Sequence, residues 1–456
     1  MDTPIVDFVR NYDRFGLLRL HMPGHKGVGP LGCEHLDITE VADADNLYAP
    51  EGIILRSEQN ASELFGAHTV YSTEGSSQCI RAMLHLAAMH ARRCGRKPLI
   101  AAGRNAHKAF LSAAALLDLD ILWLYPQQEV SYLSCRLTAE DLEQALRSAP
   151  ELPTAVYLTS PDYLGNITDI AAMAKVCHAH GILLLVDNAH GAYLRFLSPS
   201  RHPMDLGADL CCDSAHKTLG VVTGGAYLHI SRAAPAWFAQ QAKDAMALFG
   251  STSPSYLILQ SLDAVNATLA EEYPRDLAAF LLQLQALRQR LEAHGYTLLG
   301  DEPLKLTIDA KAYGYTGALA HNYEMDSLAD HLLLARVVCE FADPDFVVLM
   351  VTPQTGTEGL ARLERTLCAI PRRSPITVTP PTLSRPKRVL SVRQAALSPS
   401  RYVDAACSEG YILSAASVGC PPAVPIVACG ERIDRAAVDA FAYYGITNCC
   451  VVEETE

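Results

Sequence analysis

Four groups of polar residues stand directly after apolar segments of the chain, and their chemistry is complementary. Lys217 lies in "DSAHKTLGVV", Asp187 ends "GILLLVD", His107 follows "PLIAAGRN", and Ser76 and Ser77 follow "VYSTEG". A desolvated lysine has a lowered pKa and becomes a nucleophilic amine. A carboxylate at the end of a buried strand is costly to desolvate unless a cation pairs with it. The sequence therefore predicts a site with two components: a nucleophilic amine, and a carboxylate that pairs with a bound cation.

The remaining groups suggest what is bound. Gly75 and the two serines that follow it stand at the predicted start of a helix, where hydroxyls, backbone N–H groups and the helix dipole favour a phosphate. The ring of His107 can stack on an aromatic ligand. A phosphate, an aromatic ring, a protonated ring nitrogen and an aldehyde together describe pyridoxal phosphate. Taken one at a time, these residues have plainer readings: a helix N-cap, a polar loop histidine, and an exposed loop lysine.

The elements that must position these residues alternate between strand and helix from about residue 60 to 230. Apolar strand-like runs are followed by helical segments, which is typical of a mostly parallel sheet with helices on its faces. The runs are 98–105, 120–126, 154–161, 181–190 and 208–217, and the helical segments include 76–94, 138–149 and 169–181. Since the carboxyl ends of parallel strands meet at one edge, we expect the polar residues to gather there.

Composition narrows the classes of function. The chain has 456 residues and a formal net charge of −13, which argues against a nucleic-acid binder because phosphate neutralisation requires clustered Lys and Arg. We find no secretory leader and no apolar run long enough to cross a membrane. The chain also carries 14 cysteines. Without a leader they predict reduced thiols in a cytoplasmic protein. His21 and His25 are spaced for a metal site, but Pro23 and Gly24 break any helix between them, so no metal is predicted.

The pattern predicts several domains. We expect an N-terminal arm over residues 1–40, a large cofactor-binding domain over 41–262, a small α/β domain over 263–370, a Pro-rich linker over 371–388, and a C-terminal α+β domain over 389–456. Within the small domain, 304–310 and 345–352 are predicted strands, and 326–341 and 358–370 are predicted to contain helices.

Six segments in order resemble the Orn/Lys/Arg decarboxylase family. They are "LRLHMPGHKG", "RNAHKAF", "SPDYLGNITDI", "VDNAHGAY", "DSAHKTLGVVTGGAYL" and "STSPSYLILQSLD", and they cover most of the chain. The resemblance implies an aspartate-aminotransferase-like α/β fold and the decarboxylation of arginine, lysine or ornithine with pyridoxal phosphate. Because "MPGHKG" starts at Met22, the chain looks like the short form without the extra N-terminal domain.

The resemblance also assigns roles. Lys217 matches the lysine that binds the cofactor aldehyde, Asp187 the partner of the ring nitrogen, and His107 the histidine stacked on the ring. The remaining matches lie at the phosphate or beside the lysine: Gly75, Ser76, Ser77, Ser214 and His216. His190 occupies a flanking position in the motif that begins with Asp187. Thr252 belongs to a segment that approaches the phosphate of a neighbouring subunit, which implies a homodimer with composite sites. Either His216 or Lys217 is expected to protonate Cα after CO₂ leaves.

The match departs from the family pattern at two places. Glu74 stands where a small neutral residue is expected, and a carboxylate is unfavourable near a phosphate unless it points away. The expected aromatic-Pro-Pro-Gly-Ile-Pro string reads "CPPAVP" from Cys420 to Pro425, and no acidic residue stands shortly before it. Glu409 and Glu431 are nearby substitutes. Another pyridoxal phosphate reaction, such as transamination or elimination, and a non-catalytic cofactor-binding protein therefore remain alternatives.

Overall fold

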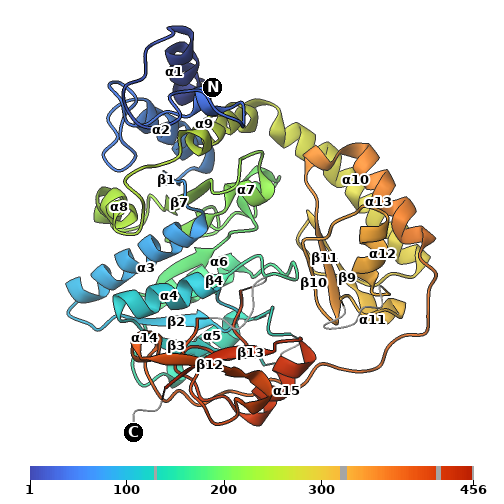
Figure 1. Ribbon diagram of the computed structural model, residues 1–456. Coiled ribbons are helices and arrows are strands. Elements are labelled where there is room, and N and C mark those ends of the chain that lie inside the picture. Colours follow the sequence, from blue (N-terminus) through green and yellow to red (C-terminus); the bar gives the residue numbers. More distant parts are fainter. Residues whose placement is uncertain (128–130, 319–325, 417–422, 454–456) are drawn as a thin grey trace. The chain divides into compact units, whose positions relative to one another are not determined.

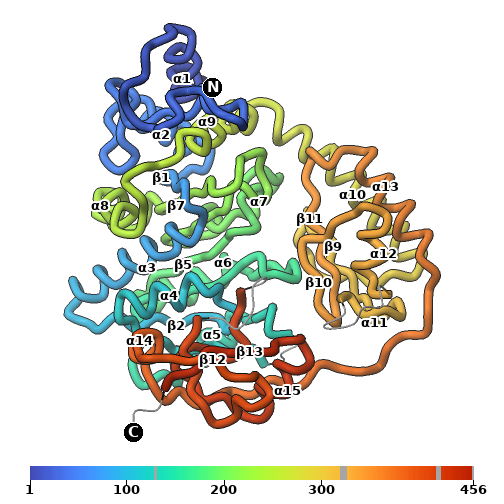
Figure 2. Tube along the Cα trace, in the orientation of Figure 1, coloured from blue at the N-terminus to red at the C-terminus, as the bar shows by residue number. Residues whose placement is uncertain are grey.

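The computed structural model describes residues 1–127, 131–318, 326–416 and 423–453. They belong to two compact units. The first unit contains residues 1–96, 154–160 and 170–276, and the second contains residues 97–153, 161–169 and 277–456. Figure 1 labels the helices and strands, and Figure 2 traces the same chain as a tube.

The first unit is built on strands that lie in the order β1-β7-β6-β5-β4. Their bounds are β1 (His68–Ser72), β4 (Ala155–Thr159), β5 (Leu183–Asp187), β6 (Leu210–Asp213) and β7 (Ala226–Ile230). β4, β5 and β6 run parallel, whereas β7 is antiparallel to both β6 and β1. The predicted mostly parallel sheet is confirmed, and every residue of β5 is buried, as its unbroken apolar run indicated.

The register of these strands sets the positions of their polar ends. Asp187, the last residue of β5, lies opposite Thr159 of β4 and Cys212 of β6. β6 ends one residue later, at Asp213. The carboxyl ends of β5 and β6 therefore meet at one edge of the sheet, where the sequence placed the candidate site.

Helices of the first unit pack on and around these strands. α3 packs against β5, β6 and β7, and α6 packs against β5. The helices are α1 (Pro4–Arg14), α2 (Ile53–Phe65), α3 (Ser76–Arg93), α6 (Ile170–Ala179), α7 (Ala215–Thr218), α8 (Trp237–Ala247) and α9 (Tyr256–Glu271), with 3₁₀ turns at Glu34–Leu36 and Ala192–Phe196. α10 (Tyr273–His294) begins at the end of this unit and continues in the second. Gly181 closes α6 in the left-handed conformation, with a φ of 66°, as its position predicted.

The second unit contains three β structures. β2 (Leu99–Gly103) and β3 (Asp120–Leu124) form a parallel pair. An antiparallel sheet has the order β10-β11-β9-β8, with β8 (Leu298–Leu299), β9 (Lys305–Asp309), β10 (Phe341–Ala342) and β11 (Phe346–Met350). β12 (Ser400–Asp404) pairs with β13 (Asn448–Val452). The strands predicted over 304–310 and 345–352 are thus confirmed.

The helices of the second unit are α4 (Lys108–Leu117), α5 (Ala139–Ser148), α11 (Ala310–Tyr313), α12 (Leu328–Leu334), α13 (Gly356–Ala369), α14 (Val392–Leu397) and α15 (Arg435–Tyr443), with 3₁₀ turns at Pro353–Thr355 and Ala405–Cys407. α12 fills only part of the predicted segment 326–341, because the chain leaves the helix and Arg336 adopts a φ of 58°. Residues 371–387 form no helix or strand, as expected of a Pro-rich linker. The five domain boundaries themselves stay a prediction. Among the described residues, no helix combines the length and apolar composition needed to cross a bilayer.

Candidate active site

Lys217 lies on α7, a single helical turn that directly follows β6. Its Nζ is 3.0 Å from Nε2 of His190, which follows β5 and is 5% exposed. Two of the predicted site residues, 27 positions apart in sequence, are therefore within hydrogen-bond distance of each other. The sequence left open whether Lys217 is an exposed loop residue. In the structure it is half-buried and in contact with an imidazole.

Asp187 ends β5 with its side chain almost fully buried, at 2% exposure. Its Oδ2 accepts a hydrogen bond of 3.0 Å from the Tyr157 hydroxyl, and its Oδ1 accepts from the backbone N–H of Ala189 at 3.2 Å and from Sγ of Cys212 at 3.7 Å. These three donors are neutral. A buried carboxylate with neutral donors suits a further, cationic N–H partner, and a protonated pyridine nitrogen is such a partner.

A cradle for an anion forms where α3 begins. Gly75 is the N-cap of this 18-residue helix, with a φ of 72° that favours glycine, and its N–H donates to Gly224 O at 2.7 Å. Ser76 and Ser77 are the first two helical residues, and Ser214 Oγ donates to Ser76 Oγ at 2.8 Å. The first turn of a helix leaves backbone N–H groups without intrahelical acceptors and carries no acidic residue here. Hydroxyls from two segments thus meet at a helix N-terminus, which fits a phosphate group.

His216 and Thr252 complete the predicted residues of the first unit. Nδ1 of His216 lies 3.0 Å from Gly225 O, and because a carbonyl only accepts, this nitrogen carries the proton. Its Nε2 is then the basic nitrogen of the neutral ring. Thr252 is exposed in the loop that precedes α9.

Glu74, the first departure from the family pattern, has a hydrogen-bond partner in a neighbouring loop. Its Oε1 accepts a hydrogen bond from the backbone N–H of Ser251, in the loop that contains Thr252. Glu74 therefore ties the segment before α3 to that loop.

His107 belongs to the second unit, where it is the N-cap of α4. Nδ1 accepts a hydrogen bond of 3.1 Å from the backbone N–H of Ala109, which fixes the ring orientation. The next residue, Lys108, donates its backbone N–H to Ala423 O at 2.9 Å. The stacking role of His107 remains a prediction.

The sequence left Glu431 as a substitute for the missing acidic residue, but its carboxylate is already bonded within the chain. Its Oε2 accepts from Arg104 Nη2 and from the backbone N–H of Ala428, both at 2.7 Å, and its side chain is 2% exposed. Burial raises the pKa of Glu431, and Arg104 opposes that shift. Glu409 is exposed on the surface. Of the "CPPAVP" segment, residues 420–422 lie outside the described residues.

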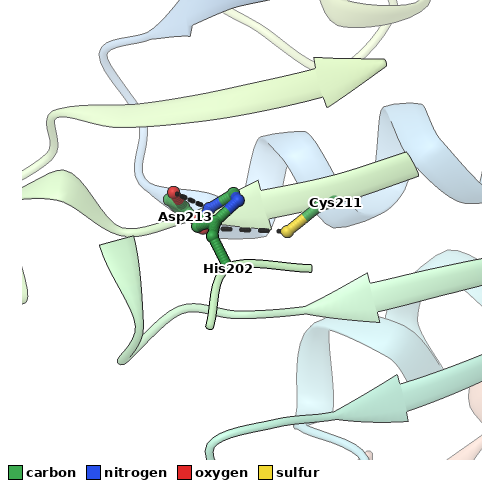
Figure 3. Close-up of side chains that lie close together, drawn as sticks. All are labelled: His202, Cys211 and Asp213. Carbon is green, nitrogen blue, oxygen red and sulfur yellow. Dashed lines mark hydrogen bonds and ion pairs between the residues drawn. The ribbon is translucent and has the colours of Figure 1, made fainter. Parts of the chain in front are cut away.

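Sequence reasoning missed a buried cluster around Asp213. His202 and His229 each place Nε2 at 3.0 Å from Asp213 Oδ2, and all three side chains are fully buried. Figure 3 shows His202 and Cys211 close to Asp213, a set that has the donor atoms of a metal site. Nδ1 of His202, however, accepts the backbone N–H of Met204 at 3.3 Å, so its Nε2 carries a proton and donates to Asp213. We therefore interpret the cluster as a hydrogen-bonded core. Asp213 itself, directly before "SAHK", was the local sequence signal for this cluster, because its histidine partners lie in other segments.

Comparison with known proteins identifies the family and the fold. Residues 3–313 match the model of the Orn/Lys/Arg decarboxylase major domain. The arginine decarboxylase of Halalkalibacterium halodurans is 28% identical over 462 residues, covering 94% of this chain and 91% of that protein. The arginine decarboxylase of Bacillus subtilis is 26% identical over 466 residues, with 95% and 91% coverage.

Solved structures agree on the fold. The lysine decarboxylase of Francisella novicida aligns with a TM-score of 0.77 at 15% identity, covering 99% of this chain and 81% of that one. The constitutive lysine decarboxylase of E. coli gives 0.74 at 16% identity, with 99% and 82% coverage. The serine palmitoyltransferase of Sphingomonas wittichii gives 0.55 at 16% identity, with 81% and 83% coverage. These likenesses confirm the predicted fold class, and the family model covers more than half of the sequence. The chain belongs to the Orn/Lys/Arg decarboxylase family.

Proposed function

We propose that this pyridoxal-phosphate-dependent decarboxylase of basic amino acids acts on arginine through Lys217 and Asp187, releasing CO₂ and the corresponding amine. One observation carries the assignment of the site. The carboxyl ends of β5 and β6 bring together a lysine in contact with an imidazole and a buried carboxylate with neutral donors, beside the N-terminus of α3. Those are the groups that an aldehyde, a ring nitrogen and a phosphate require.

Each part of the cofactor has residues suited to hold it. Lys217 would bind the aldehyde and Asp187 the ring N–H, while the hydroxyls of Ser76, Ser77 and Ser214 would bind the phosphate with the backbone N–H groups of the first turn of α3, which Gly75 caps. His107 would cover the ring, and Thr252 would approach the phosphate of a second subunit. When bound, the cofactor accepts the electron pair that remains at Cα after the carboxylate leaves.

The side chains of the chain itself supply proton transfer and orientation. His190 Nε2, at 3.0 Å from Lys217 Nζ, is placed to exchange a proton with that amine. His216 has its proton on Nδ1 at Gly225 O, which leaves Nε2 to act as a base or, once protonated, as an acid. Both Lys217 and His216 therefore remain candidates for the group that protonates Cα.

The lysine assignment has a direct test. The holoenzyme would be reduced with borohydride, digested and examined by mass spectrometry. The expected result is the mass of the reduced cofactor on the peptide that contains Lys217, and its absence in Lys217→Ala. Label on another lysine, or no label in the wild-type protein, would overturn the assignment.

The substrate assignment rests on the relatives named arginine decarboxylase, which match nearly the whole chain. An activity panel over arginine, lysine and ornithine, with CO₂, amine and keto acid measured separately, tests it. The highest kcat/KM for arginine with equal amounts of CO₂ and amine is expected. Keto acid would indicate transamination, and a cofactor-bound protein without turnover would indicate the non-catalytic alternative.

The quaternary structure and location are part of the same proposal. Large apolar side chains between residues 15 and 31 are strongly exposed, which favours cover by a second copy in a homodimer: Phe15 at 75%, Leu18 at 83%, Leu20 at 82%, Val28 at 81% and Leu31 at 81%. The described cysteines are free thiols, in keeping with a cytoplasmic enzyme of amine synthesis. Sedimentation velocity should give a dimer, and the double variant Leu18→Asp, Leu20→Asp should give a monomer.

A further inference from the structure

The carboxylate of Asp187 is held from both neighbouring strands. Tyr157 of β4 donates its hydroxyl to Oδ2 at 3.0 Å, and Cys212 of β6 places Sγ 3.7 Å from Oδ1. Tyr157 and Cys212 are both fully buried. No local pattern predicts these contacts, because both residues belong to apolar strand segments.

Both donors keep their protons over the range in which enzymes work. Burial raises the pKa of Tyr157 well above its ordinary value, and the adjacent Asp187 carboxylate raises it further. Burial likewise raises the pKa of the Cys212 thiol, with Asp187 the next cause. Neither group becomes an anion that would repel the carboxylate, so the two remain permanent hydrogen-bond donors to it.

We propose that Tyr157 and Cys212 are positioning residues that fix the orientation of Asp187 toward the ring nitrogen of pyridoxal phosphate. The inference deepens the proposed function and rests on it. A hydrogen bond to the charged form of a carboxylate stabilises that form. Without the Tyr157 hydroxyl, Oδ2 of Asp187 loses its side-chain donor, and the carboxylate is free to turn away from the ring N–H of the bound cofactor.

Other titratable groups face Asp187 as well and are left unchanged by the test. Asp213 and Cys211 lie on β6, and Cys79 lies on α3, which packs against β5. Burial raises the pKa of both Cys79 and Cys211, so these thiols stay neutral. Asp213 is already ionised, because His202 and His229 hold its pKa low against the opposing effect of burial. Within this neighbourhood, Asp187 is the carboxylate to which the Tyr157 hydroxyl donates.

A matched control exists on β7. Tyr227 is as deeply buried as Tyr157, and its hydroxyl has no hydrogen-bond partner. Tyr157→Phe and Tyr227→Phe therefore remove the same atom from equally buried rings, but only the first removes a donor to Asp187. Loss of packing affects both variants in the same way.

The first experiment measures the affinity of the apoenzyme for pyridoxal phosphate between pH 5 and 8. The affinity is compared at each pH between the variants and the wild-type protein. In Tyr157→Phe the carboxylate is no longer held toward the ring N–H, so the affinity is expected to fall about tenfold. Cys212→Ala should give a smaller loss, because a thiol is a weaker donor. Tyr227→Phe should match the wild type.

The second experiment reads the ring nitrogen directly in holoenzyme reconstituted with ring-¹⁵N-labelled cofactor. In Tyr157→Phe the ¹⁵N resonance should move toward the value of the unprotonated ring. An unchanged resonance and an unchanged affinity in Tyr157→Phe, or equal changes in Tyr227→Phe, would overturn the inference. If the wild-type apoenzyme does not bind the cofactor at all, the proposed function fails instead, so the two failures are distinguishable.

Discussion

Asp187 and Asp213 end neighbouring parallel strands, and both carboxylates are buried, yet the chain treats their charges differently. Asp213 accepts hydrogen bonds from two histidines at 3.0 Å and from Asn188 Nδ2 at 2.6 Å. The donors to Asp187 are a phenol, a thiol and a backbone N–H. Oδ2 of Asp213 accepts from two N–H groups and its Oδ1 from a third, whereas Oδ2 of Asp187 accepts from one hydroxyl and its Oδ1 from one N–H and a weak thiol donor.

This difference separates a structural carboxylate from a functional one. A buried anion whose oxygens are already shared among several N–H donors contributes to stability, whereas one with fewer and weaker donors has affinity left for an external cation. Proximity to the site does not distinguish the two carboxylates, since both end strands at the same edge of the sheet and Asp213 directly precedes Ser214. Their hydrogen-bond donors distinguish them.

The largest expected effect comes from replacing Asp187 by Asn. The amide keeps the size of the side chain and still accepts from Tyr157, but it lacks the charge that stabilises a protonated ring nitrogen. We expect kcat/KM to fall by more than about a hundredfold, the scale seen when a group that stabilises developing charge is removed. Urea unfolding of the apoenzyme should show a smaller loss of stability than the same substitution at Asp213, because the new N–H₂ displaces one backbone N–H bond and a thiol that is able to accept instead. Loss of stability with activity retained would contradict the assignment.

The same substitution at Asp213 should mainly reduce the stability of the protein. In Asp213→Asn the new amide group turns its N–H₂ toward a donor, either Asn188 Nδ2 or the two imidazoles, and leaves buried donors without an acceptor. We expect a loss of about 3 kcal/mol in the free energy of unfolding of the apoenzyme. Full restoration of stability by added Zn²⁺ in the wild-type protein after chelation would instead point to a metal site.

The sequence predicts residues that follow a local pattern, but not residues whose partners are distant in the chain. The sequence predicts Lys217, Asp187 and Ser76 as site residues because each follows a local pattern, an apolar run or helix start that ends in a polar residue. It does not predict the cluster around Asp213, because His202 and His229 come from segments whose meeting depends on the tertiary fold. Glu431 was considered for a substrate role, but its partner Arg104 lies 327 positions away, beyond the reach of any local pattern.

Asn188 links the two carboxylates. It follows Asp187 in the chain, and its Nδ2 donates to Asp213 Oδ1. Asn188→Ala removes one hydrogen bond to a buried charge, for which we expect about 1.5 kcal/mol of destabilisation. A double-mutant cycle with Asp213→Asn should show strong non-additivity, because both changes affect the same bond. Additive effects would mean that the bond contributes nothing to stability.

The smallest effect concerns pH. Burial lowers the pKa of His229 in the folded protein, and Asp213 only partly opposes this. The unfolded chain then binds a proton more readily than the folded one, so the contribution of His229 to stability is complete above its unfolded pKa of about 6.5 and declines as pH falls below that value. Urea midpoints measured at pH 7.5 and pH 5.5 should differ less in His229→Gln than in the wild-type protein. Asp187→Asn, which leaves the histidine cluster intact, should keep the wild-type difference. If both variants flattened the pH dependence equally, the two carboxylates would share one titrating network, and the separation drawn between them would fail.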